Sequence, residues 1–131
     1  LFTKYIGGDG LEADIVELPD GTQVCLGAKT NFYYDKNYGK SQRIVYLEGE
    51  AYFKVVKDTR HPFIVKSGNT QVRVLGTEFN VRSYSPAEIC VTLIKGKVAG
   101  LSDRFAGHYH FVGRLCAFND FRRWPGDYPK T

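Results

Sequence analysis

The stretch from Arg43 to Ser85, RIVYLEGEAYFKVVKDTRHPFIVKSGNTQVRVLGTEFNVRSYS, alternates apolar and polar residues over five short runs. Successive side chains of a strand point to opposite faces, so Val45 and Leu47 fall on one face, as do Ala51 and Phe53. We therefore expect five half-buried strands, with Glu48-Gly49-Glu50 as a turn between the first two. The expected strands are Arg43–Leu47, Ala51–Val56, Pro62–Lys66, Thr70–Val74 and Glu78–Tyr84.

The same pattern extends outward in both directions. Residues 12–27 read as a hairpin around the Pro19-Asp20-Gly21 turn, with Ala13, Ile15 and either Val16 or Leu18 facing inward. Further strands are expected at 30–34, 89–94 and 97–101, and no window before residue 100 favours an amphipathic helix. Glycines that we assign to structural turns or bends, where the absence of a Cβ is useful, are Gly21, Gly49, Gly68, Gly76 and Gly96.

An internal repeat supports a two-part architecture. TQVCLGAKTNF (22–32) matches TQVRVLGTEF (70–79), and VYLEGEA (45–51) matches TLIKGKV (92–98), which gives a period of about 47 residues. The fold class is therefore all-β, with about ten short strands in two packed layers around one core. A sandwich, a jelly-roll-like fold and a short twisted β-solenoid all fit this pattern.

The chain divides into three parts. Residues 1–11 are rich in glycine and read as a flexible lead-in, residues 12–100 form the β domain, and residues 101–131 form an atypical tail. The tail loses the alternation abruptly, which favours a fragment end or a reading-frame shift. A first residue that is not Met likewise favours a piece of a longer protein or a processed product. No apolar run reaches the roughly 18 residues of a membrane span.

The charge and the cysteines exclude several classes of function. A net charge of +4 is spread along the chain without a basic stripe, so we do not expect nucleic-acid binding. Cys25, Cys90 and Cys116 form no CxxC motif and are expected to be unrelated thiols, with a Cys25–Cys90 bridge as the alternative in an oxidising compartment.

Two groups of residues are candidate chemical sites. Glu48 and Glu50 could serve as the paired carboxylates of a glycosidase, but a solvated turn is the simpler interpretation. His108 and His110 could chelate zinc with Cys116 or Asp120, but isolated aromatic and imidazole side chains are commoner than metal sites. No P-loop, dinucleotide-binding or Ser/His/Asp pattern is present, so we expect no cofactor, no metal and no enzymatic activity.

Tyrosines out of phase with the expected core are the remaining candidates. Tyr46 and Tyr52 fall between inward-facing positions, and Tyr84 closes the last strand of the central stretch. Tyrosine presents an apolar ring with a polar tip, and such residues anchor protein partners or stack on sugars. We take Tyr46, Tyr52 and Tyr84 as possible partner-binding residues, with ordinary cross-strand packing as the alternative.

Four segments resemble the FecR family of bacterial anti-sigma regulators: LPDGTQV (18–24), RIVYLEGEAYFKVVKD (43–58), HPFIVKSGNTQVRVLGTEFNVRSY (61–84) and VTLIKGKV (91–98). The phrases LEGEAYF, PFIV and VLGTEFNV are specific, and the resemblance covers residues 15–99 in order. The sequence departs from the family pattern at Cys25, where an aromatic residue is usual, and after Val98.

This resemblance implies a signalling role in the periplasm. In that family a cytoplasmic segment holds an ECF sigma factor, a transmembrane helix follows, and the β domain contacts the N-terminal signalling domain of a TonB-dependent outer-membrane transducer. The resemblance therefore implies a sensor domain that relays the transducer's state by protein–protein contact, with the membrane helix and the sigma-binding segment outside this chain. A carbohydrate-binding module that uses an exposed tyrosine face is the alternative.

Overall fold

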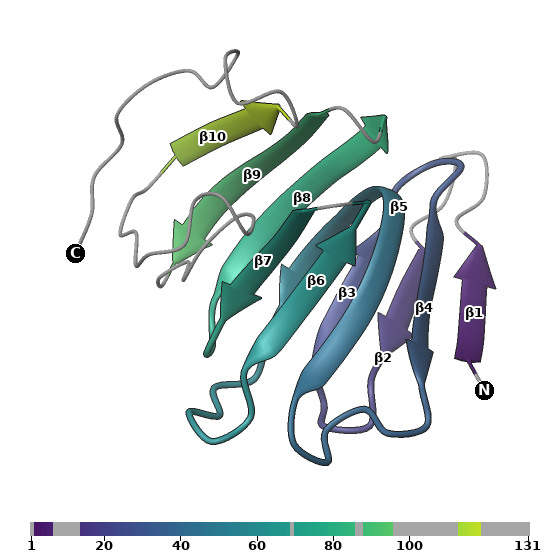
Figure 1. Ribbon diagram of the computed structural model, residues 1–131, viewed down its shortest axis with the longest axis vertical. Coiled ribbons are helices and arrows are strands. Elements are labelled where there is room, and N and C mark those ends of the chain that lie inside the picture. The colour runs from purple at the N-terminus through teal and green to yellow at the C-terminus, as the bar shows by residue number, and fades with distance from the viewer. Residues whose placement is uncertain (1, 7–13, 69, 86–87, 96–112, 119–131) are drawn as a thin grey trace.

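The computed structural model describes residues 2–6, 14–68, 70–85, 88–95 and 113–118, and these residues form ten strands and no helix (Figure 1). The strands are β1 (Phe2–Ile6), β2 (Asp14–Glu17), β3 (Gln23–Leu26), β4 (Asn31–Asp35), β5 (Arg43–Lys54), β6 (Phe63–Ser67), β7 (Thr70–Val74), β8 (Glu78–Ser85), β9 (Glu88–Lys95) and β10 (Gly113–Phe118). The all-β prediction is confirmed.

The strands form two layers that share β5. The first layer has the order β1-β4-β5-β6-β7 and uses the first half of β5, where Tyr46 pairs with Tyr33 and Lys66. The second layer has the order β2-β3-β5-β8-β9-β10 and uses the second half, where Tyr52 pairs with Cys25 and Asn80. Only the β5–β6 pair among these strands is parallel. The architecture is therefore a two-layer sandwich whose layers are joined through one strand.

The joint lies at Gly49, where β5 arches from one layer into the other, as its curved ribbon in Figure 1 shows. Gly49 has φ +130°, a backbone conformation that residues with a Cβ rarely adopt. A Cβ at this position would also overlap Thr30, because the Thr30 Cα would lie 2.9 Å from it. The Thr30 hydroxyl accepts the Glu50 N–H at 3.0 Å and donates to the Glu50 carbonyl at 3.1 Å. The expected turn at Glu48-Gly49-Glu50 is therefore wrong: one strand continues through the glycine.

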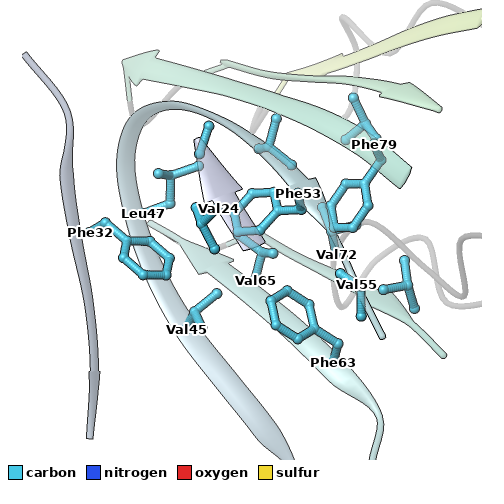
Figure 2. Close-up of a cluster of buried hydrophobic side chains, with 14 of the residues drawn as sticks. Val24, Phe32, Val45, Leu47, Phe53, Val55, Phe63, Val65, Val72 and Phe79 are labelled. Carbon is cyan, nitrogen blue, oxygen red and sulfur yellow. The ribbon is translucent and has the colours of Figure 1, made fainter. Parts of the chain in front are cut away.

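The predicted alternation describes the core well. Val45, Leu47, Ala51 and Phe53 are buried, and Phe53 packs against Phe63 and Phe79 from opposite layers with ring centroids 5.7 and 5.0 Å apart (Figure 2). The exception is the first hairpin. Both Val16 and Leu18 face inward, so Ile15 must face outward, and its side chain is 67% exposed. The expectation for Ile15 is wrong because neighbouring side chains of a strand lie on opposite faces.

The internal repeat corresponds to a repeated crossing between layers. β3 leads through the bend at residues 27–30 from the second layer to β4 in the first, and β7 leads through residues 75–77 from the first layer to β8 in the second. The last residue of each bend is a buried threonine, Thr30 or Thr77, and a fully buried phenylalanine, Phe32 or Phe79, follows two residues later. The two halves of the repeat thus supply equivalent residues to one core.

The other assigned glycines have separate roles. Gly21 (φ +91°) and Gly68 (φ +56°) lie in turns, as expected. A Cβ at Gly76 would lie 2.5 Å from the Lys57 Cα, so this bend depends on the close approach of two backbone segments. Gly96 lies outside the described residues.

Four connections meet at the end of the sandwich opposite the Gly49 arch, and we call this the loop end. It consists of residues 18–22, 36–42, 55–62 and 75–77. Arg43 is only 1% exposed and lies among these connections, and its side chain forms hydrogen bonds to three of the four. Its Nη1 donates to Asp20 Oδ2 at 3.0 Å and to the Val56 carbonyl at 2.7 Å.

The remaining donors of the Arg43 guanidinium also reach backbone carbonyls. Nε donates to the His61 carbonyl at 2.6 Å, and Nη2 donates to the carbonyls of Asp58 at 3.4 Å and Leu75 at 3.1 Å. The fourth connection is tied in through Tyr38, whose hydroxyl donates to Asp20 at 3.1 Å. A single buried cation therefore supplies the hydrogen-bond donors that these loop carbonyls need.

Asp20 is the counterion of this arrangement. Partial burial would raise the pKa of its carboxyl, but hydrogen bonds from Arg43, Thr22 and Tyr38 outweigh burial and hold the pKa below its usual value of 3.8. The carboxylate form is thus the one the fold stabilises.

The Gly49 arch predicts that an alanine substitution lowers the unfolding free energy more at Gly49 than at Gly39. Gly39 has φ +85° with open space around it, so Gly39→Ala should cost about 1 kcal/mol of unfolding free energy from backbone strain alone. Gly49→Ala adds the clash with Thr30 and should cost about 3 kcal/mol. Urea denaturation of both variants measures this, and equal losses would contradict the arch assignment.

Arg43→Met tests the loop-end cluster. Methionine keeps much of the side-chain volume but leaves Asp20 and the loop carbonyls without their donor, so we expect a loss of about 3 to 5 kcal/mol in unfolding free energy. Urea denaturation at neutral pH checks it, with Arg73→Met on the exposed surface as the matched control. A loss below about 1 kcal/mol would show that the cluster is not structurally important.

Candidate functional site

The three tyrosines predicted to bind a partner do not share one face. Tyr46 lies on the outer face of the first layer, where its ring stacks on Tyr33 with centroids 5.2 Å apart and planes 10° from parallel. Tyr52 and Tyr84 lie on the outer face of the second layer, on β5 and β8. The sequence placed these rings outside the core, but it could not show that β5 crosses between layers between Tyr46 and Tyr52.

A hydrogen-bonded network fixes the side chains on the outer face of the second layer. The Tyr52 hydroxyl donates to Glu78 at 2.9 Å, and Asn80 donates to Glu50 at 2.8 Å. The hydrogen bond to Glu78, together with slight burial and the charge of Glu78, raises the pKa of Tyr52, so this hydroxyl remains a donor. Side chains held in this way lose little conformational freedom when a partner binds.

Tyr84 is the most exposed of the three predicted tyrosines, with 48% of its area accessible. Its hydroxyl donates to the Ala28 carbonyl at 2.7 Å, and the Arg82 guanidinium carbon lies 5.3 Å from the centre of its ring. Arg82 in turn lies 4.0 Å from Glu50. The ring is therefore exposed yet held at both ends, which is the form in which tyrosine anchors protein interfaces.

Sequence reasoning missed two apolar side chains on this face. Ile15 on β2 and Ile94 on β9 are exposed and point outward from the second layer, because Val16 and Leu93 beside them face the core. Within the described residues β2 pairs only with β3, so Ile15 also marks an open sheet edge. An open edge can accept an added strand from another chain.

Glu48 and Glu50 are not brought together as a catalytic pair. Glu48 accepts the Tyr33 hydroxyl at 3.3 Å on the outer face of the first layer. Glu50, beyond the arch, is bonded to Asn80 on the second layer. A glycosidase needs two carboxylates that face one sugar, and these two belong to different faces.

The possible zinc ligands His108, His110 and Asp120 lie outside the described residues, as does the Cys116 side chain. Elsewhere in the described part, no three His, Cys, Asp or Glu residues are grouped so that they could hold a metal ion. His61 lies in the loop end, with its Nδ1 2.8 Å from Asp58 Oδ2, and this hydrogen bond lowers the pKa of Asp58.

The cysteines differ from both expectations. Cys25 is free, and Cys90 is disulfide-bonded, so the proposed Cys25–Cys90 bridge is wrong and the thiols are not all independent. In the register of β9 and β10, Cys116 is the residue directly opposite Cys90.

The residues that the structure describes include no helix that is long and apolar enough to span a membrane.

Comparisons with known proteins agree with this geometry. The model of the FecR protein family matches residues 8–99. Two crystal structures of a candidate anti-sigma factor from Parabacteroides distasonis ATCC 8503, at 2.50 and 1.65 Å resolution, are 33% identical and superpose with TM-scores of 0.80 and 0.79. No curated protein matches the chain.

The superpositions cover 92% and 91% of this chain but only 57% and 56% of the solved chains. The chain thus spans a little over half the length of these structures. The match of the family model to residues 8–99, together with the 33% identity and the TM-score of 0.80 to the first of these structures, shows that this chain belongs to the FecR family.

Proposed function

We propose that this chain is the periplasmic sensor domain of an anti-sigma factor. The observation that carries the proposal is the similarity, over nearly the whole chain, to the candidate anti-sigma factor of P. distasonis. The domain would relay the state of a TonB-dependent outer-membrane transducer by contact with the N-terminal signalling domain of that transducer. Parts of the protein outside this chain, a membrane helix and a cytoplasmic segment, would carry the signal to an ECF sigma factor.

The described faces support binding rather than turnover. Side chains on the outer face of the second layer are mutually hydrogen-bonded, and the exposed Tyr84 and Ile15 offer apolar contact area. Such a face can dock a protein through tyrosine anchors, or through strand addition at the open β2 edge.

The disulfide at Cys90 supports the periplasmic location. Structural disulfides persist in oxidising compartments such as the bacterial periplasm and are rare in the cytosol. The buried position of Cys90 on β9, at 4% exposed, is typical of a bond that stabilises the fold.

A second candidate function is carbohydrate binding, and the stacked Tyr33–Tyr46 pair favours it. The two rings lie on the outer face of the first layer, where tyrosine rings can contact a sugar. Because this pair lies on the other layer from Tyr84, the two functions predict different sensitive residues.

The test is a calorimetric titration of the domain against the N-terminal signalling domain of a TonB-dependent transducer from the same organism. We expect binding, weakened about tenfold by Tyr84→Ala because a half-exposed tyrosine anchor is lost, and unchanged by Tyr46→Ala. Thermal melting of each variant verifies that it is folded.

Absence of binding by the wild-type domain would count against the sensor function. A glycan-array signal that Tyr46→Ala abolishes and Tyr84→Ala leaves intact would establish the carbohydrate-binding function instead. Loss of transducer binding on Tyr46→Ala alone would move the contact to the first layer.

A further inference from the structure

We propose that the loop end is a docking surface for an acidic polypeptide segment that carries an apolar anchor. This inference rests on the proposed function, because it names a surface and the chemistry by which a protein partner would be recognised. It goes beyond the tyrosine-bearing faces, which lie on the flanks of the sandwich rather than at its end.

The apolar part of this surface consists of Val56 and Leu75, which are 44% and 42% exposed. Both belong to connections rather than strands, yet the Arg43 guanidinium holds both of their carbonyls, at 2.7 and 3.1 Å. They are therefore fixed near each other although 19 positions separate them in the sequence. Exposed apolar residues held in rigid positions are typical of contact surfaces.

Basic side chains surround these two residues. All of the following are exposed, lie in or next to the connections of the loop end, and take part in no ion pair within the described residues: Lys36, Lys40, Lys54, Lys57, Arg60, Arg73 and Lys95. The acidic side chains of this end are fewer: Glu17, Asp20, Asp35, Asp58 and Glu78. Asp20 is already neutralised by Arg43.

The opposite end, around the Gly49 arch, has no such excess. Among residues with described side chains, its basic residues are Lys29, Lys66 and Arg82, and its acidic residues are Asp14, Glu48 and Glu50. The positive charge of the described part is thus concentrated at the loop end, although the sequence shows no basic run. A field of this kind steers an acidic partner toward one end of the molecule.

The backbone beneath this surface is rigid. The Lys57 Cα would lie 2.5 Å from a Cβ on Gly76, and the Asp58 N–H donates to the Leu75 carbonyl at 3.0 Å, so two connections are packed directly together. A partner would meet preformed positions for Val56, Lys57 and Leu75, and binding would not have to order the loops.

The arrangement favours a polypeptide over a uniformly anionic surface. Glu17, Asp58 and Glu78 are interspersed among the basic residues, and a membrane or a nucleic acid would meet their repulsion together with the attraction. A polypeptide can place its carboxylates beside the lysines and an apolar side chain beside Val56 or Leu75.

The experiment compares Lys57→Glu/Arg60→Glu with Lys29→Glu, an exposed charge reversal at the arch end. The probes are a fluorescent synthetic peptide that alternates glutamate with leucine, vesicles containing phosphatidylglycerol, and the transducer's signalling domain. We expect the peptide to bind the wild type, to bind about tenfold more weakly to the double variant, and to bind Lys29→Glu normally. Affinity should fall as salt is raised.

Lys29→Glu carries half of the double variant's change in net charge. Weakening of about threefold or more by Lys29→Glu would therefore overturn the proposal, because the attraction would then be that of net charge alone. Vesicle binding that exceeds peptide binding and is lost in the double variant would also overturn it, in favour of a membrane contact. Leu75→Ser should weaken peptide binding without changing its salt dependence, and an unchanged affinity would remove the apolar anchor.

The signalling-domain probe separates this inference from the proposed function. If the wild type and the double variant bind that domain equally, the sensor function stands and the loop end is not its contact. If the wild type does not bind it at all, the proposed function fails, and the peptide measurements alone decide the loop-end inference.

Discussion

The structure depends on one buried cation. Arg43 begins the shared strand β5, and its side chain points into the end of the sandwich where four connections converge. Loop carbonyls at the edge of a core need hydrogen-bond donors, and a single guanidinium supplies them from a rigid, planar group. Its charge is balanced by Asp20, and its face packs 5.6 Å from the Phe63 ring centre. Segments distant in the sequence are thereby fixed to the first residue of the central strand.

The second constraint is the arch at Gly49, and it works together with the first. Because β5 bends back over this glycine, its two ends lie at the same end of the molecule, so Arg43 at its start can reach the Val56 carbonyl just beyond its finish. Thr30 fastens the arch from the opposite side through two hydrogen bonds to Glu50. A strand clamped at the bend and at both ends fixes the relative position of the two layers, which side-chain packing alone would leave less constrained.

Alternation in the sequence predicted the strands and the inward-facing residues, because a strand that is buried on one face has an apolar residue at every second position. The alternation also contains two signals of the arch and of the buried cation. Val45, Leu47, Gly49, Ala51 and Phe53 keep one phase through the glycine, which indicates a continuous strand rather than a turn. Arg43 shares that phase, which indicates that it faces inward, although an arginine side chain is rarely buried. No local pattern could reveal its partners, because Val56, His61 and Leu75 converge only in the folded chain.

For the candidate sites too, the local sequence pattern predicts which side chains face outward, but the tertiary fold decides which of them lie together. Tyr46 and Tyr52 were correctly placed outside the core, but their assignment to opposite layers depends on the arch, which is a tertiary feature. The charge asymmetry is of this kind too: Lys40, Lys57 and Arg73 are scattered in sequence, and they lie at one end of the fold because Arg43 and Tyr38 join the connections in or beside which they lie. The interaction that stabilises the loop end is therefore also the one that creates its surface. A partner that binds this end would contact surface side chains of the loop end. The positions of these side chains depend on the buried Arg43 guanidinium, because it holds the carbonyls of the connections.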